Sequence, residues 1–440
     1  MIRTTIAALA LSVAMPATAQ TVAPQTGPKV TYIQAGALLD RPGKQPRGAS
    51  TIVVRDGKVA EVRDGFVAPE AGATLVDLKD KFVLPGLIDM HVHLLGIGGD
   101  PLRARLTALN TEPADDMMYG AGNARATLMA GFTTVRELGS EPRGIRALRD
   151  AVERGDVDGP TIVNAGTAIS VTGGHGDPLN GLAEPYAHAV AATVENTCDG
   201  TDDCRRATRR QIGLGAQVVK ITATGGVLSN VSGGLGRAFT LEEMRAIVDT
   251  AHGLGRKVAA HAHAADGVVG ALEAGVDSIE HGSFLDDRSI ALLKKTGAYL
   301  VPTEIAPVAA LAQARAGALP PATIPKAEAA AAAMVDSHRR AYRAGVKFAF
   351  GTDTGVSKHG RNAEEFALLV NQIGMTPTIA IRTATVDAAD LLGRSDLGGI
   401  APGMVADIIA VTGSPLEDVR RLERVDFVMH HGRVAKPLAQ

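Results

Sequence analysis

The sequence predicts an α/β protein, a TIM (β/α)8 barrel with a small β-sandwich domain built from both termini. Three observations support this prediction. Strand-like and helical segments alternate over residues 84–399, which is typical of a parallel sheet covered by helices. Short β-branched runs separated by turns fill residues 28–83 and 400–440. Polar residues stand at the ends of several predicted strands, where a barrel has its active site.

Residues 1–19 are interpreted as a secretory signal peptide. Arg3 precedes an apolar stretch, and "ATA" forms a small-residue cleavage site that ends at Ala19. The stretch is shorter than the roughly 20 apolar residues that span a membrane, and we find no longer one in the rest of the sequence. We therefore expect cleavage near Ala19, export to the periplasm or medium, and no membrane attachment of the mature chain.

The composition argues against several classes of function. The formal net charge is −2 and both signs are scattered, so we expect no dedicated nucleic-acid binder. Aromatic residues make up 3% of the chain and Trp is absent, so platforms for stacking bases or sugars are scarce. The expected partner is a small molecule.

The terminal segments predict the small β-domain. The dipeptide Asp56-Gly57 is a hairpin signal between two β-branched runs of residues 28–83. The same pattern of short β-branched runs is found in "ADIIAVTG" and "DFVMHHGRVAK", within residues 400–440. We therefore expect the two ends of the chain to share one domain.

The central segment contains eight strand candidates, with helical segments such as the alanine-rich "KAEAAAAAMVDSHRRAYRAG" between most of them. The candidates are, in order, "FVLPGLIDMHVHL", "FTTVREL", "TIVNAGTAIS", "QVVKITAT", "KVAAHAHA", "DSIEHG", "AYLVPTE" and "KFAFGTD". Eight strand–helix units predict the barrel.

Two histidines, His91 and His93, lie two residues apart in the first candidate and so point to one face of the strand. Alone, this spacing allows either a pair of core histidines or two ligands of one metal ion. Further polar residues end the fourth, fifth, sixth and eighth candidates, namely Lys220, His261, His281 and Asp353. Because these ends meet at one rim of a barrel, the pattern favours a metal site.

This pattern resembles the binuclear-metal branch of the amidohydrolase superfamily, as do "VLPGLIDMHVHL" and the closing "GMVADIIAVTGSPLEDV". The segments "TGGHGD", "VVKITATGGVLS" and "AAHAHAADGV" resemble its imidazolonepropionase-like, Xaa-Pro-dipeptidase-like group. That group includes exported dipeptidases and carboxypeptidases, and ochratoxin-hydrolysing amidases. The resemblance covers nearly the whole mature chain and implies a homo-oligomer.

The resemblance also implies two divalent metal ions. Imidazoles and carboxylates suit Zn²⁺, although Co²⁺ or Mn²⁺ fit the same donors. The implied ligands are His91, His93 and Asp353 for one ion and His261 and His281 for the other, with Lys220 bridging both after carboxylation by CO₂. Apolar strand neighbours desolvate Lys220 and favour the neutral amine that reacts with CO₂. The alternative for Lys220 is a salt bridge to Asp353.

The expected function is an exported binuclear zinc amidohydrolase that cleaves N-acyl amino acids or dipeptides by metal-hydroxide attack. Asp353 is expected to pass the proton to the departing amine. His175 in "TGGHGD" either contacts the substrate or is held by its own loop. Because the resemblance makes His261 the ligand, His263 beside it is expected to support the ligands or contact the substrate. The alternatives are a cyclic-amide hydrolase, like imidazolonepropionase, and a non-catalytic protein of this fold.

Several other residues carry secondary predictions. Cys198 and Cys204 close a short loop, and export favours a disulfide between them. The glycine-rich segment "TGGVLSNVSGGLGRAFT", residues 224–240, is interpreted as a flexible lid rather than a nucleotide-binding loop, because it follows Lys220 instead of opening a helix. Arg136 and Arg237 are expected in structural salt bridges rather than at a substrate carboxylate. The histidines expected at the surface of helices are His188, His252 and His338, and His430 and His431 fall in a terminal hairpin.

Overall fold

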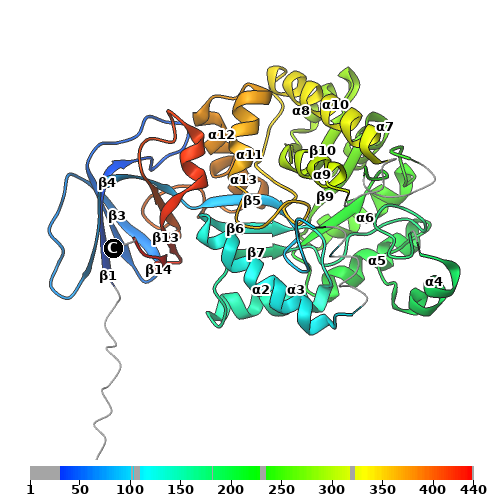
Figure 1. Cartoon of the computed structure of the whole chain (residues 1–440), viewed down its shortest axis with the longest axis horizontal. Coiled ribbons are helices and arrows are strands. Elements are labelled where there is room, and N and C mark those ends of the chain that lie inside the picture. The colour runs from blue at the N-terminus through cyan, green and yellow to red at the C-terminus, as the bar shows by residue number, and fades with distance from the viewer. Residues whose placement is uncertain are drawn as a thin grey trace, which may run out of the picture.

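The computed structural model describes residues 30–100, 103, 110–180, 182–227, 234–317 and 323–438. The predicted signal peptide, residues 1–19, lies outside them. A sheet from both ends of the chain lies at one end of the molecule, and a larger α/β body forms the rest (Figure 1). Within the described residues, every helix is too short or too polar to cross a membrane.

The terminal sheet has seven strands in the order β14-β13-β12-β4-β1-β2-β3. Their bounds are β1 Val30–Leu38, β2 Ser50–Arg55, β3 Lys58–Asp64, β4 Thr74–Pro85, β12 Ile408–Val411, β13 Val425–His430 and β14 Arg433–Lys436. The two ends of the chain join where β12 pairs antiparallel with β4. The predicted hairpin is confirmed, because Asp56 and Gly57 have positive φ between paired β2 and β3. The strands belong to one mixed sheet, so a sandwich of two separate sheets is not confirmed.

The α/β body contains two parallel sheets, ordered β5-β6-β7 and β11-β10-β9-β8. Their bounds are β5 Leu87–Val92, β6 Phe132–Glu137, β7 Thr161–Asn164, β8 Val218–Thr222, β9 Lys257–Ala264, β10 Ser278–Phe284 and β11 Tyr299–Val301. The first predicted strand divides into the end of β4 and all of β5, because the chain passes from the terminal sheet into the body at Gly86.

Helices separate most of these strands and pack around the body (Figure 1). They are α2 Pro113–Met129, α3 Pro142–Arg154, α4 Glu184–Val190, α5 Thr201–Gly213, α6 Leu241–Gly253, α7 Ala265–Ala274, α8 Asp287–Thr296, α9 Ile305–Arg315, α10 Thr323–Arg343, α11 Glu364–Leu368, α12 Pro377–Thr383 and α13 Val386–Leu392. The alanine-rich segment lies within α10, as the sequence predicts.

Backbone contacts link the edges of the two parallel sheets. Ile169, beyond β7, forms a parallel bridge with Ile221 of β8. Residues 347–353, the eighth predicted strand, form isolated contacts rather than a regular strand. The Ala349 N–H donates to the Leu300 carbonyl at 3.1 Å, and the Met90 N–H donates to the Phe350 carbonyl at 2.8 Å. The fold is therefore TIM-barrel-like, with these residues lying between β11 and β5.

Candidate active site

The carboxyl ends of the parallel strands surround a cavity of about 560 Å³. All the sequence-predicted site residues line it, namely His91, His93, His175, Lys220, His261, His263, His281 and Asp353. They come from β5, β8, β9 and β10 and from the loops after β5, β7 and residues 347–352. Segments far apart in the sequence thus bring these side chains together.

His91, His93 and Asp353 form the tightest part of the cluster, with one potential ligand atom from each within 4.8 Å of the others. Asp353 Oδ1 lies 3.1 Å from His93 Nε2 and 3.5 Å from His91 Nε2. Asp353 reaches this position with a φ of 55°, a left-handed conformation that is costly for a residue other than glycine.

In both of these histidines, Nδ1 already has a hydrogen-bond partner. His91 Nδ1 donates to Glu280 at 2.9 Å, and His93 Nδ1 donates to the Gly139 carbonyl at 2.9 Å. In the neutral rings each Nε2 is then a lone pair that faces the Asp353 carboxylate. A cation between these acceptors removes their repulsion, so the three residues fit a metal ion on the chemistry of their donors.

The other two predicted histidine ligands lie beside this group. The ring centroids of His261 and His281 are 4.7 Å apart, and those of His281 and His91 are 5.1 Å apart. His281 Nδ1 is hydrogen-bonded to the Thr303 hydroxyl at 2.8 Å. His261 differs, because its Nε2 lies 3.3 Å from the Gly225 carbonyl. Both rings are buried, so they sit in a low-dielectric environment.

Lys220 is buried in β8, and its Nζ lies 3.4 Å from His91 Nε2. Burial lowers its pKa to about 8, which leaves a larger neutral fraction at neutral pH than an exposed lysine has. Among the described residues no carboxylate forms an ion pair with Lys220, so the salt bridge to Asp353 that the sequence allowed is not formed.

The electrostatics favour neutral imidazoles at His91, His261 and His281 and an ionised carboxylate at Asp353. His93 is the exception: burial lowers its pKa, but the hydrogen bond and charge of Asp353 outweigh burial and raise it. Burial and the charge of Lys220 lower the pKa of His91 to about 4. Burial and neighbouring histidines hold the pKa of His261 and His281 well below the usual value. Burial raises the pKa of Asp353, but its interactions with His91 and His93 outweigh burial and bring it to about 2. Neutral imidazoles and an ionised carboxylate are the forms that bind metal.

Arg136 and Glu280 form a buried ion pair beneath the cluster, at 2.7 Å. Arg136 also donates to the Met90 carbonyl at 2.7 Å, so the structural salt bridge expected for it is confirmed. The pKa of Glu280 is about 2, because the attraction of Arg136 and the hydrogen bond from His91 exceed the cost of burial. The sequence interpretation missed Glu280. Strand alternation places it opposite His281, but a φ of 72° at His281 breaks that alternation.

Glu137 at the end of β6 is a second missed carboxylate. Its side chain is fully buried, and it accepts a hydrogen bond from the Ser140 hydroxyl at 2.5 Å. Burial raises its pKa to about 7, against the opposing charge of His93. The sequence did contain evidence for Glu137, because this residue lies near the end of the second predicted strand, at the rim that carries the other site residues.

His338 was expected at the surface, and this expectation is wrong. The residue is fully buried on α10, where its Nε2 donates to the His281 carbonyl at 2.5 Å. Its Nδ1 lies 2.6 Å from a carboxylate oxygen of Glu304. The buried neighbours Met334 and Ala341, four residues before and three after, mark the helix face that reveals this burial. The side chains of His188 and His252 are exposed, as expected. Arg237 is exposed too, and the salt bridge expected for it is not found among the ion pairs of the described residues.

His175 lies in the long loop after β7, stacked on His261 with ring centroids 4.4 Å apart. Its ring packs so closely on Gly226 that a Cβ there would meet it at 2.4 Å. His263 stacks on His281 at 5.0 Å, and its Nδ1 is hydrogen-bonded to the Ser283 hydroxyl at 2.8 Å. Both residues therefore contact predicted metal ligands.

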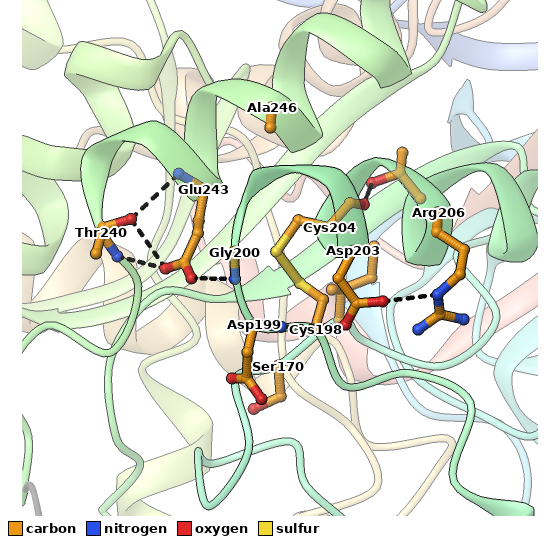
Figure 2. The surroundings of a disulfide bond; sticks show 12 residues. Ser170, Cys198, Asp199, Gly200, Asp203, Cys204, Arg206, Thr240, Glu243 and Ala246 are labelled. Carbon is orange, nitrogen blue, oxygen red and sulfur yellow. Dashed lines mark hydrogen bonds and ion pairs between the residues drawn. A yellow bond between two sulfur atoms is a disulfide. The ribbon is translucent and has the colours of Figure 1, made fainter.

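The predicted disulfide between Cys198 and Cys204 is confirmed. Figure 2 shows it where the segment that follows α4 enters α5, close to Ser170 and to Glu243 of α6. The Cys198 N–H donates to the Ser170 carbonyl at 2.9 Å, and the Gly176 N–H donates to the Ser170 hydroxyl at 3.2 Å. The disulfide thus anchors the loop that carries His175.

One wall of the cavity is apolar. It is formed by small and apolar side chains of α9 and α10, namely Ala306, Pro307, Ala310, Ala327, Ala330 and Met334. Val227, at the base of the glycine-rich loop, faces the same cavity. The middle of the predicted lid, residues 228–233, lies outside the described residues. Among the described lining residues, Lys220 is the only lysine or arginine.

Known proteins resemble this chain in sequence and, where their structures are solved, in fold. Residues 82–435 match the model of the Amidohydrolase family. Ochratoxinase from Aspergillus niger is 33% identical over 425 residues, which cover 91% of this chain and 85% of that protein. Imidazolonepropionase from Nocardia farcinica is 28% identical, covering 84% and 87%. A crystal structure of a Xaa-Pro dipeptidase with bound methionine in the active site is 39% identical, has a TM-score of 0.86, and covers 92% and 99%.

Proposed function

Because the chain belongs to the amidohydrolase family and is a hydrolase acting on C–N bonds, we propose that it cleaves the amide bond of N-acyl amino acids or dipeptides. The observation that carries this proposal is the convergence of the predicted ligands on one cavity. These residues are His91, His93, Lys220, His261, His281 and Asp353. The names of the relatives, ochratoxinase and Xaa-Pro dipeptidase, support an amide or peptide bond as the target.

We assign two divalent ions, most simply Zn²⁺, to the six residues, with carboxylated Lys220 shared between them. The neutral ε-amine that burial favours in Lys220 is the form that adds to CO₂. When bound, such ions polarise the amide carbonyl and lower the pKa of water, as is general for metal-assisted hydrolysis.

The residues of the chain then divide the remaining work. Asp353, ionised and within reach of the reacting centre, accepts a proton from water and gives it to the leaving amine. His263 and His175 are placed to hydrogen-bond the substrate, since both line the cavity. The apolar wall from α9 and α10 holds an apolar substrate side chain, because burial of apolar surface is favourable there.

Export and self-association belong to the same proposal. The signal-like residues 1–19 support an exported enzyme, and the family resemblance supports a homo-oligomer. We also propose that residues 347–353 complete a closed eight-membered barrel, since their backbone bonds reach both β11 and β5.

The test is elemental analysis of the purified protein together with release of free amino acid from a panel of N-acyl amino acids and dipeptides. We expect at least two metal equivalents, with hydrolysis abolished by chelation and by Lys220→Ala. Full activity of Lys220→Ala would overturn the role given to this lysine. Two metal ions without hydrolysis anywhere in the panel would favour cyclic amides, the substrates suggested by the imidazolonepropionase relative.

A further inference from the structure

A second group of histidines and an aspartate lies away from the cavity. Asp407, His430 and His431 each offer one potential ligand atom within 4.8 Å of the others. Asp407 directly precedes β12, and the two histidines lie at the turn between β13 and β14. Thr161, the first residue of β7, faces both rings. Since the cavity lies at the carboxyl ends of the parallel strands, this group lies at their opposite, amino end.

The two rings converge on one point. The Thr161 hydroxyl oxygen lies 3.1 Å from His430 Nε2 and 3.0 Å from His431 Nε2. The ring centroids are 4.5 Å apart with an interplanar angle of 85°. His431 takes a φ of 49° beside Gly432, so the tight turn itself aims both side chains at β7.

Hydrogen bonding accounts for the histidines but not for the aspartate. One ring can receive the Thr161 proton while the other donates to its oxygen, so both Nε2 atoms are satisfied. Asp407 is 5% exposed, and its Oδ1 accepts the His431 backbone N–H at 2.8 Å. Its buried Oδ2 has no hydrogen-bond partner among the described residues. No ion pair joins Asp407 to a described lysine or arginine. A buried acceptor with no donor is costly, and a cation is the partner that removes the cost.

We propose that Asp407, His430 and His431 bind a divalent transition-metal ion, with Zn²⁺ as the ion that suits two imidazoles and one carboxylate. Such a set is a known zinc donor type. Ligand atoms around a tetrahedral zinc lie roughly 3.4 Å apart when the bonds are about 2.1 Å, so atoms that lie within 4.8 Å of one another would approach by at most about 1.4 Å.

The position of this site assigns it a structural role. It joins the β13–β14 hairpin of the terminal sheet to β7 of the α/β body, segments that are 269 residues apart at His430 and Thr161. An ion that binds only the folded arrangement stabilises it by mass action. At a free Zn²⁺ concentration about 100 times the dissociation constant, the unfolding equilibrium constant falls about a hundredfold.

The experiment compares Zn²⁺ stoichiometry of the full mature protein with that of His430→Gln and His431→Gln, after excess metal is removed by gel filtration. The control is His252→Gln, because His252 is also an exposed histidine that pairs with an aspartate, Asp277 at 2.8 Å. We expect each test variant to bind one equivalent less than the wild type, the control to bind the wild-type amount, and the wild-type melting temperature to rise more with Zn²⁺ than that of His431→Gln.

Equal stoichiometry in wild type and both variants would overturn the site. A second readout needs no variant: Zn²⁺ should protect His430 and His431 of the wild type from diethyl pyrocarbonate, as measured by mass spectrometry. Unchanged labelling would also overturn it. Because the difference between wild type and variants is measured here, the result is independent of how many ions the cavity holds or whether the enzyme is active.

Discussion

Two clusters of the same residue types lie at opposite ends of the parallel strands. At the carboxyl end, His91, His93 and Asp353 line a cavity of about 560 Å³, together with Lys220 and four further histidines. At the amino end, Asp407 and two histidines meet at a junction between two sheets, with one ring exposed. The difference shows that a cluster of histidine and aspartate side chains does not by itself identify a catalytic site. A catalytic site is identified by further converging groups and by space for a substrate.

The two ends also differ in what supports them. At the carboxyl end, each of three outer ring nitrogens is held by a specific partner, from Glu280, Gly139 and Thr303. Beneath them lie buried carboxylates with shifted pKa values, such as Glu137. Such concentration of perturbed groups is typical of active sites. The amino-end cluster has one shared hydroxyl, from Thr161.

The largest predicted effect separates the two aspartates. Asp353→Asn should lower kcat by about 10²–10⁴-fold, because an amide cannot take and return the proton. Asp407→Asn is the matched control and should keep the wild-type rate, since it lies at the far end of the strands. Steady-state kinetics with metal content measured in parallel tests this. Equal losses of kcat in the two variants would contradict the functional distinction between the clusters.

The support beneath the cavity predicts a large effect on stability. Arg136→Met leaves Glu280 as an unpaired buried charge, which should cost about 3–5 kcal/mol in free energy of unfolding. Adding Glu280→Gln should recover part of that loss, because the uncompensated charge is removed. Denaturant unfolding of the single and double variants measures both. A double variant less stable than Arg136→Met alone would contradict this account.

The disulfide between Cys198 and Cys204 (Figure 2) belongs to the support of the carboxyl-end cluster, because it anchors the loop that carries His175. Replacing Cys198 and Cys204 by serine should lower stability by about 2 kcal/mol, as expected for a short closed loop. Catalysis should weaken as well, since the loop contacts His261 through His175. Unfolding curves and kcat with and without reductant provide the measurement. Reductant should leave the double serine variant unchanged, and a wild type equally insensitive to it would disprove the role.

The smallest predicted effect is a pH dependence of stability that comes from Glu365. Its carboxylate accepts hydrogen bonds from the backbone N–H groups of Glu304 and Ile305. Burial and the charge of Glu304 raise its pKa well above the usual value. The folded state then binds more protons than the unfolded state above about pH 4.5, so this contribution to stability falls as pH rises. Stability of Glu365→Gln should therefore decline less than wild type between pH 5 and pH 8. The neighbouring Glu364→Gln should follow the wild-type trend.

Local patterns in the sequence determined much of the molecule. The spacing of His91 and His93 placed both on one strand face, and Asp56-Gly57 located a hairpin, because strand period and turn sterics are short-range properties. The alternation of strands and helices predicted a TIM-barrel-like body, and its rim assembled residues as distant as His91 and Asp353. The pair Cys198 and Cys204 needed only proximity in the chain.

Tertiary structure decided the rest. His281 turns towards the cavity beside Glu280 because of its own positive φ, which alternation does not reveal, and His338 is buried because α10 packs its face on β10. Residues 347–353 bend away from regular strand geometry near Asp353, which also has positive φ. His430 and Thr161 meet across 269 residues. Sequence periodicity records local backbone geometry, whereas these contacts depend on how whole elements pack and on single strained residues that redirect a side chain.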